Sequence, residues 1–105
     1  MHQLIALYNH PEDAAAFDRH YLGTHGPLAT KLPGLQRFTT MHPGPDPEGN
    51  PPAYYFIAVL DFADGAAVQS AVASPEGEAA IADLANFAQA GVTILTGAGE
   101  VVVSA

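Results

Sequence analysis

The chain contains no cysteine and very few basic residues. Without cysteine it has no disulfide, no thiol nucleophile and no thiolate ligand for a metal ion. Only Arg19, Lys31 and Arg37 carry a positive charge, against 11 acidic residues, so the formal net charge is −8. Nucleic acids and anionic membrane surfaces are bound mainly through Lys and Arg. We therefore expect neither nucleic acid nor a membrane as a partner.

Long apolar segments are absent as well. No run is long enough to cross a bilayer, and the N-terminus lacks the basic and apolar regions of a signal peptide. We therefore expect a cytoplasmic protein. There is also no serine elbow and no Walker loop, and Gly97-Ala-Gly99 is too short for a dinucleotide fingerprint. Carboxylates are scattered over expected loops and helix starts, so a paired-carboxylate site is not indicated.

The 105 residues suffice for one domain, which we place at residues 1–105. Strands are expected at residues 2–8, 35–42, 54–62 and 92–103. A first helix is expected to begin at Pro11 and to stop at Gly23 or Gly26, and two further helices are expected after the capping residues Asp64 and Ser74. This order predicts an α+β fold with a ferredoxin-like β-α-β-β-α-β chain and a four-stranded antiparallel sheet.

The expected strand at residues 54–62 is largely apolar on both faces. Helices would cover one face of the sheet, so the other face also needs a cover. Two sheets packed face to face in a twofold dimer would supply it, and a homodimer is therefore expected. The connection at residues 42–53 holds five prolines and should be exposed. Whether it acts as a lid is left open.

Two histidines lie near the expected end of the first helix. His25 should sit just beyond it, before Gly26-Pro27, where a neutral imidazole can relay a proton near pH 7. The alternative is a capping or solvated loop histidine. His20 can line a pocket between helix and sheet, but a half-buried histidine bonded to a backbone carbonyl is the favoured interpretation. The two are five residues apart, which is not the i, i+4 spacing of metal ligands, so no metal site is expected.

Aromatic residues and one cation complete the candidate site. Tyr8 ends the first strand, Tyr21 faces inward from the first helix, and Tyr55 and Phe87 are further candidate substrate contacts. A phenol can donate a hydrogen bond to a developing oxyanion, although ordinary core packing is the safer interpretation for any single tyrosine. Arg37 can bind a substrate carboxylate or pair with a carboxylate such as Asp61 at the sheet edge, and we weigh these equally.

Two stretches resemble the EthD family. They are Tyr8…Phe17-x-x-His20-Tyr21-x-x-x-His25-Gly-Pro-Leu28…Leu32-Pro-Gly34 and Ser74-Pro-Glu-Gly77…Asp83-Leu-x-Asn-Phe87. The resemblance implies a dimeric α+β barrel, the fold of muconolactone isomerases and cofactor-free monooxygenases. It also implies that His25 is the recurrent histidine of the family and Tyr21 the aromatic before it, whereas His20 stands where another aromatic is more usual. Family members and relatives are associated with accessory roles in ether degradation, lactone isomerisation, and dehydration or decarboxylation of aromatics.

The leading hypothesis is a small homodimeric enzyme that needs no cofactor and moves a proton on a hydrophobic cyclic or aromatic substrate. His25 would carry the proton, with Tyr8 and His20 as further catalytic candidates. Tyr21, Arg37, Tyr55 and Phe87 would contact the substrate. The rival is a ligand-binding or accessory protein without turnover. A third possibility is a dimerising domain that lacks a cavity of about 300 Å³, the usual lower size of ligand pockets.

Overall fold

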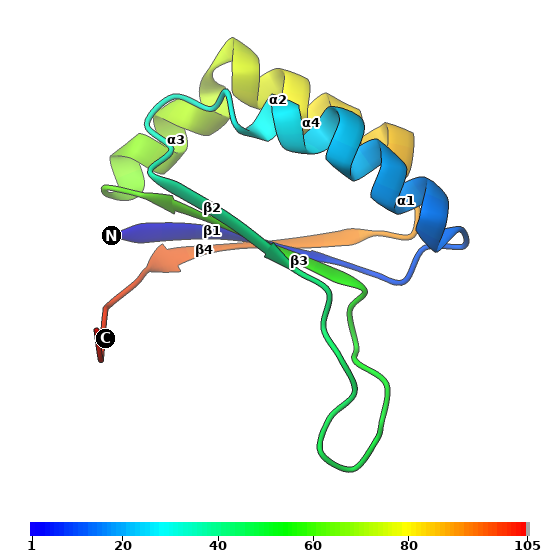
Figure 1. Cartoon of the computed structure of the whole chain (residues 1–105). Coiled ribbons are helices and arrows are strands. Elements are labelled where there is room, and N and C mark those ends of the chain that lie inside the picture. The colour runs from blue at the N-terminus through cyan, green and yellow to red at the C-terminus, as the bar shows by residue number, and fades with distance from the viewer. Residues whose placement is uncertain (105) are drawn as a thin grey trace.

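The computed structural model describes residues 1–104 and consists of one helical layer on one sheet (Figure 1). The strands are β1 (His2–Tyr8), β2 (Arg37–Met41), β3 (Phe56–Phe62) and β4 (Val92–Ala98). They form a four-stranded antiparallel sheet in the order β2-β3-β1-β4. The expected α+β, ferredoxin-like fold is confirmed. Within the described residues, no helix is long and apolar enough to cross a membrane.

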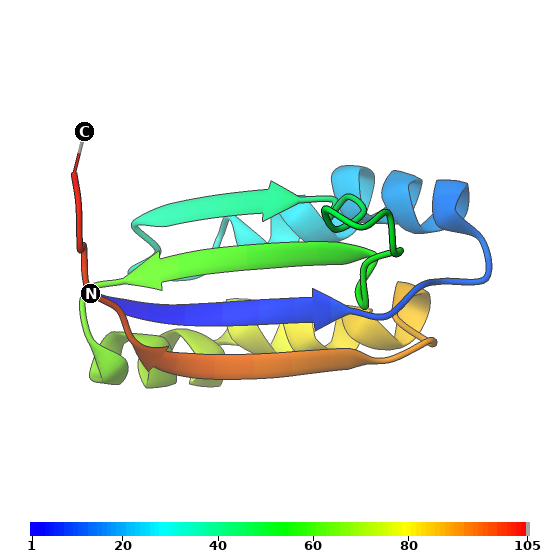
Figure 2. The ribbon, with the colours of Figure 1, turned by 90° about the horizontal axis from the view of Figure 1, so that it is seen from below.

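Two helical segments cover one face of the sheet. The first comprises α1 (Ala14–His20), the π-helical turn η1 (Tyr21–His25) and α2 (Gly26–Ala29), and the second comprises α3 (Gly65–Ala73) and α4 (Pro75–Phe87). Figure 2 shows the opposite face of the sheet without any helix. The loop at residues 42–53 leaves the sheet on this open side, so it does not lie over the helical layer (Figure 1).

Local capping explains where the helices begin. The expected first residue, Pro11, is wrong, because α1 starts after Asp13, whose carboxylate accepts a hydrogen bond from the Ala16 amide at 3.0 Å. The predicted caps Asp64 and Ser74 are confirmed: they accept from Ala67 N and Gly77 N at 2.8 Å and 3.0 Å. Strands β2, β3 and β4 are shorter than expected at one or both ends.

The expected break of the first helix at Gly26-Pro27 is also wrong. The backbone keeps right-handed helical dihedrals from His20 through Thr30, and the Gly26 amide donates to Tyr21 O, five residues back. This wide turn adds a residue to the helix without ending it. Pro27 lies at the start of α2, where its missing N–H is tolerated. His25 is therefore a residue of a continuous helical segment and not of a loop.

Gly77 allows α3 and α4 to approach each other closely. A Cβ at this position would lie 2.5 Å from the carbonyl oxygen of Val72 and would also collide with that of Ala71. We predict that Gly77→Ala lowers the free energy of unfolding by about 2 kcal/mol, since overpacking against backbone outweighs the better helix propensity of alanine. Urea unfolding measures the change. Gly23→Ala is the matched control, because a Cβ there meets nothing within 4 Å. Equal stability of the two variants would contradict the packing account.

Candidate functional site

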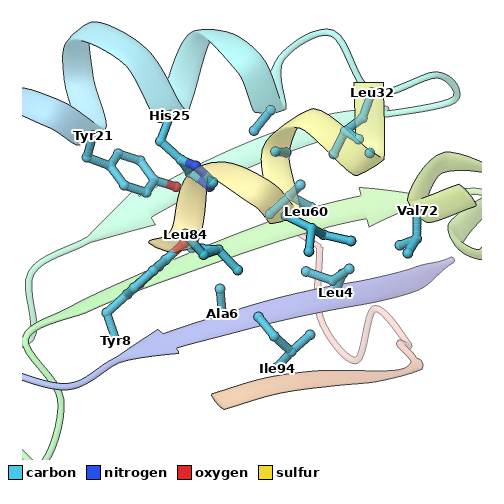
Figure 3. Close-up of a pocket in the computed structure, with 15 residues that line it drawn as sticks. Leu4, Ala6, Tyr8, Tyr21, His25, Leu32, Leu60, Val72, Leu84 and Ile94 are labelled. Atoms are coloured by element: carbon cyan, nitrogen blue, oxygen red, sulfur yellow. The ribbon is translucent and has the colours of Figure 1, made fainter. Parts of the chain in front are cut away.

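The site is a cavity of about 280 Å³ between the helical layer and the sheet (Figure 3). Its floor includes Ala6 of β1 and Ala58 of β3, which are direct register partners. Its other small lining residues are Ala29, Gly77 and Ala80. Packed cores ordinarily leave few voids, so a cavity lined at five positions by Ala or Gly is a distinct feature of this core. Its volume is just below the usual lower size of ligand pockets.

Three aromatic or imidazole rings meet at one end of the cavity. Tyr8, Tyr21 and His25 all line it and are 2%, 4% and 6% exposed. Figure 3 shows the Tyr21 ring and the His25 ring side by side on the helix, with Tyr8 rising toward them from β1. Centroid distances are 5.9 Å between Tyr8 and Tyr21 and 5.3 Å between Tyr21 and His25. The sequence-based prediction thus named three residues that the fold brings together.

Asp83 of α4 holds two histidines and was missed by the sequence analysis. His25 Nδ1 lies 3.0 Å from Asp83 Oδ2, and His20 Nε2 lies 2.9 Å from both carboxylate oxygens. Asn86 Nδ2 donates to Asp83 Oδ1 at 2.9 Å. Asp83 is only 6% exposed, and a buried carboxylate needs such donors. The expectation that the carboxylates lie on loops and helix starts is wrong for Asp83, which lies in the second half of α4.

The π-helical turn explains why both histidines reach one carboxylate. Five residues of ordinary α-helix would place His20 and His25 about 140° apart around the axis. The wide turn η1 changes this phase, and both imidazoles face Asp83. The favoured interpretation of His20, a bond to a backbone carbonyl, is wrong for Nε2, which bonds the Asp83 carboxylate. No group of three or more His, Asp or Glu side chains in residues 1–104 is arranged to hold a metal ion.

The contact with Asp83 sets the tautomer of His25. A carboxylate accepts hydrogen bonds, so Nδ1 carries the hydrogen and Nε2 keeps its lone pair. Within residues 1–104, His25 Nε2 and the hydroxyl groups of Tyr8 and Tyr21 have no hydrogen-bond partner. Every side-chain N or O atom there that is fully enclosed does have a partner. These three polar atoms are therefore open to the cavity.

Burial keeps the site uncharged at its inner surface. It lowers the pKa of His25, an effect that the hydrogen bond and charge of Asp83 partly oppose. Burial, reinforced by nearby Asp83, raises the pKa of Tyr8 far above its usual value. Burial, with a smaller contribution from Tyr8, does the same for Tyr21. At neutral pH the cavity thus presents a neutral imidazole and two phenols that donate hydrogen bonds.

Asp83 behaves as the fixed negative charge behind this surface. Burial alone would raise its pKa, but the hydrogen bonds from Asn86, His20 and His25 outweigh burial and lower it. The carboxylate therefore stays ionised at neutral pH and can stabilise a proton that arrives on His25. This is the arrangement of a general base with an orienting acid behind it.

The remaining candidate residues lie outside the cavity lining. Phe87 packs beside the imidazoles, 4.7 Å from His25 and stacked on His20 at 5.1 Å, and it lines a separate, more polar hollow together with His20. Tyr55 donates its hydroxyl hydrogen to Asp18 at 2.9 Å. Arg37 is exposed on the open face of the sheet. It stands opposite Asp61 in register, but no ion pair joins the two in the described chain, and Asp61 accepts from Gln3 Nε2.

Comparisons with known proteins agree with the sequence-based resemblance and with this fold. The model of the EthD domain matches residues 9–91. An uncharacterized 11.0 kDa protein in the thcB-thcC intergenic region of Rhodococcus erythropolis is 46% identical over 95 residues, which are 90% of this chain and 91% of that protein.

Two solved structures are also similar. The crystal structure of an EthD family protein from Bacillus halodurans is 36% identical, with a TM-score of 0.89 over 95% of this chain and 99% of that chain. A dimeric ferredoxin-like protein of unknown function from Thermobifida fusca is 18% identical, with a TM-score of 0.69 over 92% and 89%, and shows the shared fold. The resemblance drawn from the sequence is confirmed, and the chain belongs to the EthD family.

Proposed function

We propose that this protein is a cofactor-independent enzyme that moves a proton on a small, neutral, cyclic carbonyl compound. The observation that carries the proposal is the open Nε2 atom of His25, backed by Asp83 and facing an apolar cavity. Proton transfer by a placed side chain is most efficient when the pKa of that side chain lies near the working pH. His25 is neutral at pH 7 because burial lowers its pKa, and the ionised carboxylate behind it can stabilise the proton that it accepts.

The proposed step is a proton shift next to a carbonyl group. His25 Nε2 takes a proton from the carbon beside the carbonyl, and the electron pair of that C–H bond delocalises onto the carbonyl oxygen. Tyr8 and Tyr21 donate hydrogen bonds to this oxygen while it carries negative charge. Asp83 stabilises the imidazolium through Nδ1–H. His25 then returns the same proton to another carbon of the conjugated system, so atoms and charge balance.

The experiment uses a β,γ-unsaturated methylbutenolide, which isomerises to the conjugated α,β-unsaturated lactone when one proton moves. Conjugation changes the ultraviolet absorbance, so the rate can be followed directly. The purified protein should accelerate the isomerisation above the rate in buffer, and Tyr8→Phe should slow it by removing one donor. Acceleration that survives in His25→Ala at the wild-type rate would contradict the proposal.

A ligand-binding role without turnover is the second candidate. The apolar lining of the cavity favours it, since such a cavity binds small apolar molecules whether or not it changes them. The two roles differ in the fate of the ligand. Recovery of the butenolide unchanged after saturating binding would favour the binding protein.

We predict that kcat/KM falls at acid pH and does not fall near neutral pH. The reactive form has a neutral His25, and burial lowers the pKa of His25 below its ordinary 6.5. Activity should therefore be constant from pH 7 to pH 9 and fall only at pH values below 6.5. The raised pKa values of Tyr8 and Tyr21 exclude an alkaline limb in that range. A half-maximal point above pH 6.5 would contradict the assignment of the base.

We further propose that two copies of the chain pack through their open sheet faces. The open face carries Ile5, Leu7, Ile57, Val59 and Leu95. The accessible surface of the single chain is 6361 Å², whereas a monomer of this mass is expected to expose about 5,600 Å². The single chain thus exposes more surface than a monomer of its mass, as expected for one half of a dimer. The Thermobifida fusca relative is described as dimeric, which supports the same assembly here.

Val59→Lys tests this interface, because Val59 is paired with Ile5 near the middle of the open face. We predict a dimer for the wild type and a monomer for Val59→Lys in light scattering coupled to gel filtration. Ala82→Lys places the same charge on the exposed side of α4 and should leave the dimer intact. A monomeric wild-type protein would refute the proposed assembly.

A further inference from the structure

We propose that the cavity binds its ligand end-on: a neutral six-membered-ring carbonyl compound with its oxygen at Tyr8 and Tyr21 and an alkyl group on the far side of the ring. The alkyl group would run toward a rim formed by Val72, Ile81 and Ile94. This inference rests on the proposed function and specifies its substrate class and binding direction.

The cavity has one polar end and one apolar end. Its polar atoms belong to Tyr8, Tyr21 and His25, which lie together near the C-terminal end of β1. Leu4 lines the cavity four residues earlier on the same strand, about 13 Å away at the rise of an extended chain. Between them the small side chain of Ala6 leaves the floor open. Figure 3 shows the polar rings at one side of the cavity and Val72 at the other.

The charge of the lining excludes a carboxylate ligand. The chain has three Lys or Arg residues, Arg19, Lys31 and Arg37, and none lines the cavity. The nearest fixed charge is the negative Asp83 carboxylate behind His25. An anion at this end would be repelled by Asp83 and would have no cation to bind. A neutral carbonyl oxygen instead matches the two phenolic donors.

The rim residues are exposed although they line the same cavity. Val72, Ile81 and Ile94 are 37%, 51% and 46% exposed, and they come from α3, α4 and β4. Apolar side chains that converge around an opening from three elements are typical of a binding mouth. Val72 lies at the apolar end, and Ile94 stands opposite Ala6 in register, so the opening extends from the middle of the cavity toward its apolar end. A ligand whose polar head reaches Tyr8 and Tyr21 therefore enters head first and leaves its tail at the rim.

The volume limits the length of that tail. The cavity of about 280 Å³ equals the space of about nine water molecules in the liquid. A six-membered ring with a carbonyl group uses most of this space. A short alkyl chain would fill the remainder and then contact the rim, where longer chains enter water.

The experiment measures binding of 4-methyl-, 4-ethyl-, 4-propyl- and 4-pentylcyclohexanone to the purified protein by titration calorimetry. Each buried methylene should tighten binding about fourfold until the chain passes the rim. The 2-alkyl isomers, whose chains lie beside the oxygen, should show no such gain. 4-Alkylcyclohexanecarboxylates should bind at least tenfold more weakly than the matching ketones, because the cavity holds no cation.

Two exposed positions on α4 give a matched pair of variants. Ile81→Glu places a charge at the rim and should abolish the gain with chain length. Ala82→Glu adds the same charge one residue later, at an exposed position outside the cavity lining, and should keep the gain. Neither residue belongs to the buried core.

The inference is overturned if the 2-alkyl isomers gain as much as the 4-alkyl series, if Ile81→Glu keeps the gain, or if no ketone binds at millimolar concentration. Each of these results leaves the proposed function separately measurable, because isomerisation of the methylbutenolide needs no alkyl tail. If the protein does not isomerise the methylbutenolide but does show the predicted chain-length series, catalysis is refuted and the binding direction is retained.

Discussion

His25→Ala should lower the turnover of the butenolide by about 10²–10⁴-fold, the usual contribution of a positioned general base. The variant removes the only imidazole that lines the cavity within residues 1–104, and no other lining side chain there can accept a proton near pH 7. The expected loss is in kcat, because the ligand contacts made by Tyr8 and Tyr21 stay in place. Initial rates at saturating lactone measure it.

A second substitution separates chemistry from packing. His25 contacts Phe87 and Tyr21, so alanine also leaves a space in the core. His25→Gln keeps a polar side chain of similar size but cannot relay a proton near pH 7. Both variants should bind 4-propylcyclohexanone, and both should be inactive to a similar degree. A loss of less than threefold in either folded variant would remove His25 from the mechanism.

Asp83→Asn should lower turnover by more than about tenfold, although Asp83 does not line the cavity. Asp83 acts as a positioning residue, since its carboxylate fixes the His25 tautomer with Nε2 free. An asparagine can offer an N–H group to Nδ1 and thereby select the opposite tautomer, and this exchange costs about 10⁴ in a serine-protease triad. The expected signature is a fall in kcat with little change in KM.

The pH profile distinguishes this role from a general loss of structure. Asp83 raises the pKa of His25 through its hydrogen bond and its charge, in opposition to burial. Without that charge the acid limb of kcat/KM should move to lower pH. Asn86→Ala is the matched control, because it removes another hydrogen-bond donor of Asp83 but keeps the carboxylate. An unshifted acid limb in Asp83→Asn would contradict the coupling.

The arrangement of the elements was predictable because its signals are local. Asp64 and Ser74 are capping residues directly before apolar helices, and the short apolar run Phe56–Phe62 is typical of a strand covered on both faces. Tyr8, Tyr21 and His25 were also placed at one site from sequence. Tyr8 ends a strand beside the first helix, whose inward face carries Tyr21, and the family resemblance singled out His25.

Two features were missed by the sequence analysis, the π-helical turn and the role of Asp83. The π-helical turn depends on a single extra residue in the helix, and Gly26-Pro27 looks like a helix stop in the sequence. Asp83 did leave a signal, because it lies three residues after buried Ala80 and four before buried Phe87 on the apolar face of α4. A carboxylate on such a face indicates a buried partner.

The face of the sheet on which Arg37 lies could not be predicted, for a different reason. Alternation assigns Arg37 and Phe38 to opposite faces of β2, but both faces of the neighbouring strand β3 are apolar. Sequence alone therefore could not tell which face the helices cover. The structure places Phe38 against the helical core and leaves Arg37 on the open face.

The most direct test of this account is the nitrogen-15 NMR spectrum of the His25 side chain, with and without 4-propylcyclohexanone. The account predicts a neutral ring at pH 7 with its hydrogen on Nδ1, and a shift of the Nε2 resonance when the ketone is added. A hydrogen on Nε2, or an Nε2 resonance unchanged at saturating ketone, would contradict the claim that His25 presents a free base to a bound ligand.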